Sequence, residues 1–155
     1  IDKKLCPVYT KYLFEMYNAQ KICVKWGDSI SRTCVVSNGV KQGGVLSPLL
    51  FTLYVDELLV RLKGLGFGCH LGTKFAGCFA YADDIVLLSP SLLGLRRMLH
   101  MCASFSDEYF VKFNPTKSRI VVYNNSSRPN QVPCLCFLGS NIEVVKDEEH
   151  FLHFK

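Results

Sequence analysis

The sequence has no apolar run of the roughly 18 residues needed to cross a bilayer. Its charged start, IDKK, is not followed by the apolar core of a signal peptide. It also lacks internal repeats and low-complexity tracts, which argues against solenoid and fibrous architectures. We therefore expect a soluble, unsecreted chain with an intracellular location, in the nucleus or the cytoplasm.

No C-x-x-C pair occurs among the eight cysteines, so neither a zinc ribbon nor a redox motif is indicated. Most of the cysteines fall inside apolar patterns, where free cysteine behaves as a small hydrophobic residue. We expect buried, reduced thiols and a reducing compartment. The cysteines are at positions 6, 23, 34, 69, 78, 102, 134 and 136.

Acidic residues are outnumbered, with 13 Asp and Glu against 18 Lys and Arg, which gives a formal charge of +5. This excess suits a polyanionic partner such as a nucleic acid without requiring one. At 155 residues and 49% hydrophobic content, the chain is about one domain with enough apolar material for a core.

The first third of the chain changes its hydrophobic period twice. Helical spacing predicts a helix over Pro7–Asn18, and alternation then predicts a basic hairpin from Lys21 to Val36 with its turn at Gly27-Asp28. A polar loop follows over 38–44. Ser47-Pro48 has the composition of a helix start and predicts a helix over about Pro48–Lys63, which glycines from Gly64 onward would end.

The rest of the chain repeats this mixture of short strands and helices, which favours an α+β fold over a doubly wound parallel sheet. Ser89-Pro90 is the second predicted helix start. The expected order is a strand ending at Ala82, a turn at Asp83-Asp84, a strand over Ile85–Leu88, a helix to about Phe110, a strand over Arg119–Tyr123, a loop over 124–133 and an apolar strand over Leu135–Leu138.

The stretch FAYADDIVLLS places two adjacent acids, Asp83 and Asp84, between two apolar runs. If the runs pair as an antiparallel hairpin, both carboxylates lie close together near its tip, where they repel each other. Asp is a good turn former, which is one explanation. A divalent cation that prefers hard oxygen ligands is the other, because it would remove the repulsion.

Four segments carry a more specific pattern: GVKQGGVLSPLLF at 39–51, FAYADDIVLLSPS at 79–91, FNPTKS at 113–118 and CFLG at 136–139. In this order they resemble reverse transcriptases, and specifically those of non-LTR (LINE-type) retrotransposons. FAYADDIVLLSPS resembles the catalytic hairpin of that family, and GVKQGGVLSPLLF is similar to the loop-and-helix motif upstream of it. FNPTKS at 113–118 is similar to the segment whose lysine lies near the triphosphate, and CFLG at 136–139 to the hairpin that grips the primer. Together these matches are far more specific than any one of them.

The resemblance implies an RNA-directed DNA polymerase that extends a DNA primer on an RNA template with deoxynucleoside triphosphates. Such an enzyme uses two Mg²⁺ ions, with Mn²⁺ as the alternative, to align and neutralise the reacting groups. By this resemblance Asp83 and Asp84 are the metal ligands and catalytic residues, and Lys117 is a further catalytic residue. The expected nucleotide or template contacts are Gln42, Gly43 and Gly44, and the expected primer contacts are Tyr81, Ala82, Phe137, Leu138 and Gly139.

The implied fold is a polymerase palm with a ferredoxin-like core and part of the fingers, as a single partial domain over 1–155. We assign about 1–47 to the junction of fingers and palm, about 48–142 to the palm and 143–155 to a tail. The thumb is missing, and so is the family's third aspartate, which would precede Pro7–Asn18. We therefore expect a fragment or degraded copy that is inactive alone and has exposed apolar surface.

Three other interpretations remain. One is a noncatalytic nucleic-acid-binding remnant that keeps the basic hairpin and the glycine loop, and another is a group II intron type reverse transcriptase, whose motifs are similar. An RNA-dependent RNA polymerase is less favoured, because GDD is the more usual hairpin there and this chain has YADD at 81–84. No membrane partner is expected, and the oligomeric state is not indicated.

Overall fold

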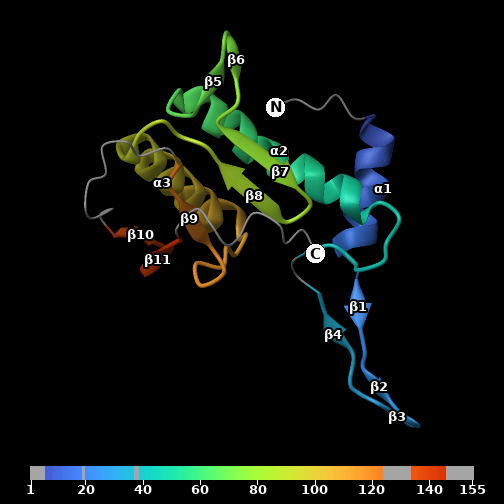
Figure 1. The fold of residues 1–155 in the computed structure, drawn as a ribbon. Helices are drawn as coiled ribbons and strands as arrows, with labels where there is room; N and C mark the ends of the chain where they lie inside the picture. Colours follow the sequence, from blue (N-terminus) through green and yellow to red (C-terminus); the bar gives the residue numbers. More distant parts are fainter. Residues whose placement is uncertain (1–5, 19, 37–38, 124–133, 146–155) are drawn as a thin grey trace. The chain divides into compact units, whose positions relative to one another are not determined.

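The structure is a computed structural model that describes residues 6–18, 20–36, 39–123 and 134–145. Short strands alternate with three helices in the described residues (Figure 1), so the predicted mixture of helices and strands is confirmed. The chain divides into two compact units, residues 1–57 and 58–155. None of the described helices combines the length and the apolar character that crossing a membrane requires.

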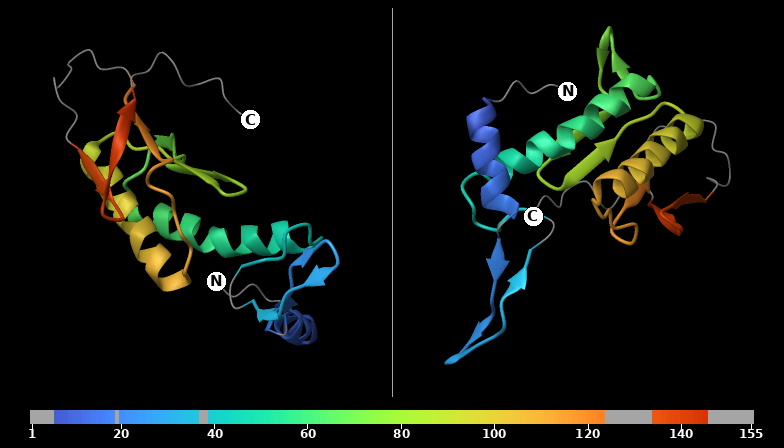
Figure 2. Two further views of the ribbon diagram at one scale, coloured as in Figure 1. Left: turned by 90° about the horizontal axis from the view of Figure 1, so that it is seen from below. Right: turned by 180° about the vertical axis from the view of Figure 1, so that it is seen from behind.

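The first unit begins with helix α1, Pro7–Asn18, at the predicted bounds. The basic hairpin is also confirmed: β1 (Lys21–Ile22) pairs with β4 (Cys34–Val35), and β2 (Lys25–Trp26) pairs with β3 (Ser29–Ile30). Figure 2 shows the hairpin as a narrow arm with β2 and β3 at its far end. No residue of α1 is buried, and every residue of the four short strands is exposed.

Helix α2 runs from Ser47 to Leu65 and passes from the first unit into the second. It is slightly longer than predicted, and Gly64 does not end it. An added Cβ at Gly64 would meet nothing within 4 Å, so the helix accommodates this residue without a special contact. The helix ends where Gly66 takes φ +70°, a conformation that glycine adopts easily, and the Gly66 amide donates to the Lys63 carbonyl at 3.3 Å.

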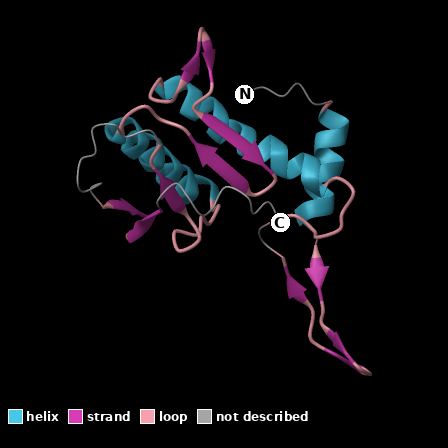
Figure 3. Cartoon of the chain, in the orientation of Figure 1, coloured by secondary structure: helices cyan, strands magenta, loops and turns pink. Residues whose placement is uncertain are grey.

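The second unit contains two hairpins and a small mixed sheet (Figure 3). β5 (His70–Leu71) pairs with β6 (Lys74–Phe75), and β7 (Cys78–Tyr81) pairs with β8 (Asp84–Leu87). The three-stranded sheet has the order β10–β11–β9, in which β10 (Leu135–Phe137) is antiparallel to β11 (Ser140–Val145) and β9 (Arg119–Val121) is parallel to it. β11 thus continues past the predicted tail boundary at 143, whereas the predicted loop 124–133 and tail residues 146–155 lie outside the described residues.

Helix α3, Leu92–Tyr109, starts two residues later than Ser89-Pro90 suggested. Ser91 is the N-cap, and its hydroxyl accepts a hydrogen bond from the Gly94 amide at 3.1 Å. The Ser89 hydroxyl instead donates to the Phe67 carbonyl at 3.0 Å, which ties the loop before the helix to the end of the preceding segment. Phe110 closes the helix in the left-handed region, with φ +57°.

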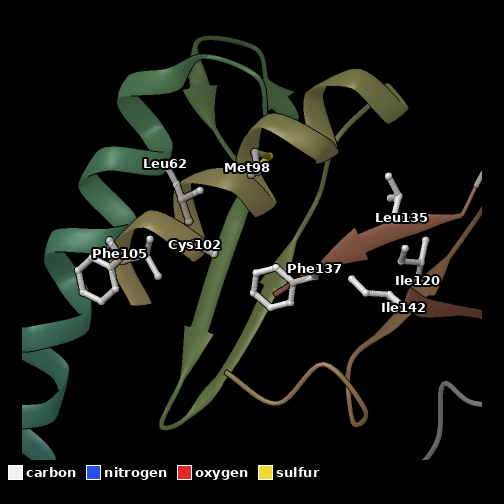
Figure 4. Close-up of a cluster of buried hydrophobic side chains, with 9 residues drawn as sticks. Leu62, Met98, Cys102, Phe105, Ile120, Leu135, Phe137 and Ile142 are labelled. Carbon is white, nitrogen blue, oxygen red and sulfur yellow. The ribbon is translucent and has the colours of Figure 1, made fainter. Parts of the chain in front are cut away.

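One hydrophobic cluster holds the second unit together (Figure 4), between the end of α2, helix α3 and the three-stranded sheet. Burial of a large apolar side chain stabilises the fold by about 1.5–3 kcal/mol, so this cluster dominates the stability of the unit. The inner face of β7–β8 packs against it through Cys78, Ile85 and Leu87. The cluster consists of Leu58, Leu62, Met98, Cys102, Phe105, Ile120, Leu135, Phe137 and Ile142.

The prediction of buried cysteines is largely wrong. Only Cys102 is buried, and burial raises the pKa of its thiol to about 12. Cys69 and Cys78 are half-buried, and the remaining five are exposed because their segments bury little, as on the hairpin arm that carries Cys23 and Cys34. All eight are free thiols.

A polar network joins α2 to α3 beside the cluster. The Arg61 guanidinium donates to both carboxylate oxygens of Glu108, at 2.6 and 3.0 Å, and to the Tyr109 hydroxyl at 3.0 Å. It also lies over the Tyr109 and Phe105 rings, which stack on each other at 4.4 Å. This side-chain hydrogen bond to Arg61 holds the pKa of Glu108 below its usual range. A planar guanidinium suits both contacts, which a lysine would not reproduce.

Candidate active site

The β7–β8 hairpin carries the two adjacent acids, and its register follows from its alternating pattern. Cys78 pairs with Leu87 and Ala80 with Ile85, and of these four Cys78, Ile85 and Leu87 pack against the hydrophobic cluster. Phe79, Tyr81 and Val86 alternate with them and are exposed on the outer face. The hydrophobic pattern therefore fixes which way Asp84 faces, because Asp84 lies on the outer face with Tyr81, its partner in the ladder.

The turn of this hairpin lies one residue earlier than predicted. Tyr81 pairs with Asp84, so the two-residue loop is Ala82-Asp83 rather than Asp83-Asp84. A turn at Asp83-Asp84 would set Cys78 opposite Ser89 in place of Leu87. That register would turn a polar residue toward the cluster and would lose the Ser89 hydrogen bond to Phe67, so the apolar pairing explains the observed turn.

Ala82 has φ +51°, which is unusual for a residue other than glycine. A positive φ at the first loop position and a negative one at the second is the sign pattern of a type II′ hairpin turn, where glycine is preferred. An alanine there stores about 1–2 kcal/mol of backbone strain. Such strain persists only where the surroundings hold it, and here the packed inner face of the hairpin does so.

Both carboxylates are exposed, and neither has a hydrogen bond or ion pair within the described part of the chain. Asp83 lies in the loop, and Asp84 is the first residue of β8. Two neighbouring hard-oxygen donors fit part of the ligand set of a divalent cation. The described residues contain no group of three or more His, Cys, Asp or Glu side chains arranged to hold a metal, so the fit is to two ligands only.

The Gln-Gly-Gly loop, in the first unit, is a tight turn with a local reason for each glycine. The Gly44 amide donates to the Lys41 carbonyl at 3.1 Å, and Gly43 has φ +74°, which together define a type II turn with Gln42 at its exposed corner. An added Cβ on Gly44 would lie 2.5 Å from the Ser47 hydroxyl oxygen. That hydroxyl is buried and donates to the Lys41 carbonyl at 2.6 Å.

Lys117 is exposed on a turn before β9. The Asn114 side chain accepts from the Thr116 amide at 3.1 Å and from the Thr116 hydroxyl at 2.7 Å, and the Lys117 amide donates to the Asn114 carbonyl at 3.2 Å. This Asn-Pro turn is therefore well defined. Phe113, just before it, packs against the hydrophobic cluster, so the turn has a fixed base.

The β10–β11 hairpin carries the three remaining predicted primer contacts, and they divide by burial. Phe137 is 5% exposed, belongs to the cluster and lies 5.8 Å from the Phe113 ring, so its side chain is a packing residue. Leu138 and Gly139 form the two-residue loop, with φ +49° and +79°. Both are exposed, and positive φ at both positions is typical of a type I′ turn.

The structure thus places Asp83, Lys117 and Leu138 at the exposed ends of three segments that rest on the same cluster. Gln42 and its glycines belong to the other unit. The sequence analysis missed the exposed apolar outer face of β7–β8, which also includes Leu88. The alternation in the strand was a usable signal, because it implies a second face opposite the buried one.

Residues 3–142 match the reverse transcriptase (RNA-dependent DNA polymerase) family. The chain belongs to this family. The family implies a nucleic acid template and primer with deoxynucleoside triphosphates, and reverse transcriptases generally use divalent metal ions. The enzyme class of that family is RNA-directed DNA polymerase, a nucleotidyltransferase.

Relatives of this reverse transcriptase domain come from mobile elements. It is 37% identical over 87 residues to the Pol polyprotein of the type-2 retrotransposable element R2DM of Drosophila melanogaster, a match over 56% of this chain and 8% of that protein. It is 29% identical over 131 residues to the Pol polyprotein of an R2 element of Nasonia vitripennis, over 84% of this chain and 13% of that protein. A probable RNA-directed DNA polymerase from the Drosophila melanogaster transposon BS is 31% identical over 124 residues, over 75% of this chain and 13% of that protein.

These matches confirm the predicted likeness to a partial reverse transcriptase domain of a non-LTR retrotransposon. The reverse transcriptase domain spans between 8% and 13% of the length of the relatives described above.

Proposed function

We propose that the protein to which this domain belongs extends a DNA primer on an RNA template by adding deoxynucleotides to the 3′ end. The observation that carries the proposal is the β7–β8 hairpin, which presents two carboxylates with no partner among the described residues, at an exposed, strained turn fixed on a packed core. Family membership supports the same chemistry. In this proposal β7–β8, α3 and the β10–β11–β9 sheet form part of a polymerase palm, and the protein works in the nucleus or the cytoplasm.

Asp83 and Asp84 would hold the divalent ions, for which Mg²⁺ is the proposed species and Mn²⁺ the alternative. When bound, these ions would neutralise the negative charge of the triphosphate. The chain's own contribution is rigid placement, because packing of Ile85 and Leu87 fixes the strand that begins at Asp84. With two carboxylates and no third acidic ligand in the described part of the chain, we expect weak metal binding and negligible turnover by this chain alone.

The remaining roles come from the family resemblance, and the exposure of most of these residues supports them. Gln42, at the corner of its type II turn, would contact the template or the incoming nucleotide, and Gly43 and Gly44 would let the backbone approach closely. The Lys117 ammonium would lie near the triphosphate. Tyr81, Ala82, Leu138 and Gly139 would contact the primer end, whereas Phe137 would act only by supporting its hairpin.

Manganese binding tests the metal assignment directly. Mn²⁺ would be titrated into the intact chain and free Mn²⁺ measured by electron paramagnetic resonance, for the wild type and for Asp83→Asn, Asp84→Asn and Asp28→Asn. Asp28 is the matched control, because it also lies in an exposed two-residue hairpin loop but has no acidic neighbour. Binding should weaken in the first two variants and stay unchanged in the third. Equal Mn²⁺ binding by all four proteins would contradict the assignment of Asp83 and Asp84 as metal ligands.

A noncatalytic nucleic-acid-binding role is the second candidate, favoured by the two-ligand acidic site. Primer extension on an RNA template with Mg²⁺ or Mn²⁺ separates the two. We expect this chain alone to give no useful product, and robust product would contradict the argument from the missing third ligand. In a longer polyprotein that contains this domain, Asp83→Asn should abolish extension if the catalytic proposal is right, and Asp28→Asn should not.

A further inference from the structure

The hairpin arm, defined here as Lys21–Val35, leaves a large apolar surface uncovered. Trp26, the chain's single tryptophan, is 86% exposed. Ile22 and Val24 are also exposed, and strand alternation places them on the same face as Trp26. No ring contact or hydrogen bond engages the Trp26 side chain within the described part of the chain. An isolated two-stranded hairpin is only marginally stable, so an arm of this composition calls for a partner.

The arm is shaped by a tight tip and a bulge. Trp26 pairs with Ser29, so Gly27-Asp28 is a two-residue loop, and Gly27 has φ +57°. Between the pairs Ile22–Cys34 and Lys25–Ile30, the returning strand has one extra residue. The Val24 amide there donates to the Ser31 hydroxyl at 2.9 Å, and the Ser31 amide donates to the Val24 carbonyl at 2.9 Å. A bulge that uses a side chain to complete the ladder is a specific feature of the arm.

Charge identifies the kind of partner. The arm carries Lys21, Lys25 and Arg32 against one acid, Asp28, and all four are exposed. Lys21 and Lys25 occupy the face opposite Trp26, while Arg32 lies at the bulge. Lysine is depleted from protein interfaces, whereas basic residues on the same element as an exposed aromatic ring are typical of surfaces that bind single-stranded nucleic acid. The arm thus fits a polyanion with exposed base faces better than it fits a second protein.

We propose that the arm is a binding site for single-stranded nucleic acid, with Trp26 stacked on a base and Lys21, Lys25 and Arg32 paired with phosphates. Duplex DNA or RNA is a poorer ligand, because its bases are already stacked and offer no free face at a narrow hairpin tip. The site lies on the arm and uses neither the acidic hairpin nor Lys117. It therefore goes beyond the proposed polymerase function and does not depend on it.

Because Trp26 is the sole tryptophan, its fluorescence reports on this site alone. The intact chain would be titrated with 3′-blocked single-stranded RNA and DNA in EDTA and without nucleotides, so that catalysis is impossible. We expect quenching of Trp26 emission by at least one of the two strands and little quenching by the corresponding duplex. Comparison of the RNA and DNA titrations shows which kind of strand the site prefers. Concentration-dependent burial of Trp26 without any oligonucleotide would instead identify a second copy as the occupant and overturn the proposal.

Variants are compared by anisotropy of a labelled oligonucleotide. Trp26→Ala should weaken binding on the order of tenfold, since base stacking on an aromatic ring is worth about 1–3 kcal/mol. Lys25→Ala should lower the slope of log affinity against log salt by about 0.7. Tyr12→Ala, on exposed α1 of the same unit, is the matched control and should bind as the wild type. Circular dichroism checks folding. Unchanged affinity in Trp26→Ala, with unquenched wild-type emission, would refute the proposal.

Discussion

Replacement of Ala82 by glycine should stabilise the second unit, against the usual direction of an alanine-to-glycine change. Ala82 has φ +51° at the tip of β7–β8, which costs an alanine about 1–2 kcal/mol. Glycine removes that cost, but it also gives the unfolded chain more conformational freedom, which lowers the free energy of unfolding by about 0.5–1 kcal/mol. The difference predicts a net stabilisation of about 0.5–1 kcal/mol for Ala82→Gly.

Ala80→Gly is the matched control. Ala80 lies two residues earlier in the same hairpin, opposite Ile85, and its φ is not positive. Glycine at position 80 relieves no backbone strain and should lower the free energy of unfolding by about 0.5–1 kcal/mol. The two substitutions make the same chemical change, so opposite signs can come only from the backbone conformation.

Urea unfolding followed by far-UV circular dichroism measures both variants, because the signal is dominated by helices such as α3 in this unit. Tryptophan fluorescence would not serve, since Trp26 lies in the other unit. With a typical slope near 2 kcal/mol per molar urea, the two midpoints should differ by about 0.5–1 M with the slopes unchanged. If Ala82→Gly destabilises as much as Ala80→Gly, the left-handed conformation of Ala82 and the stored strain are both wrong.

Three further substitutions probe features outside this hairpin. Gly44→Ala should cost about 1–3 kcal/mol of local stability through the clash with the Ser47 hydroxyl, whereas Gly64→Ala, with open space in α2, should gain about 0.5–1 kcal/mol. Hydrogen exchange at the Ser47 amide and urea unfolding would measure these effects, and a neutral Gly44→Ala would contradict the turn geometry. Glu108→Gln should lower stability at neutral pH. Because Arg61 depresses the folded-state pKa of Glu108, this deficit should shrink as the pH falls below the unfolded value of roughly 4.3, in urea unfolding from pH 7 to pH 3. A deficit that is constant across that range would refute the pairing.

Elements with a strong period were predictable from the sequence. Helix α1 has the expected bounds and the hairpin has its turn at the expected Gly27-Asp28, because helical spacing and a glycine-containing turn are local signals. The start of α3 was missed by two residues, because both Ser89 and Ser91 are suitable N-cap residues. Only the folded contacts decide that Ser91 caps the helix while Ser89 bonds to Phe67.

The candidate site was predictable in its residue types but not in its geometry. The pair Asp83 and Asp84 was found from the sequence, yet the turn position depends on which apolar residues of β7 and β8 face the hydrophobic cluster. Burial of Phe137 likewise follows from packing against Phe113. The exposed thiols were missed because Cys23 alternates with apolar residues in a hairpin that packs neither face. Periodicity indicates a face, but tertiary contacts decide whether anything covers it.

Because one cluster supports the acidic turn, the Lys117 turn and the Leu138 loop, damage to its interior would show up as a biochemical defect far from the mutated residue. A cavity left by Met98→Ala, of the kind that costs about 2–5 kcal/mol, would loosen all three segments together. Screens for inactive elements should therefore recover heat-sensitive substitutions at α3 positions alongside the aspartates themselves.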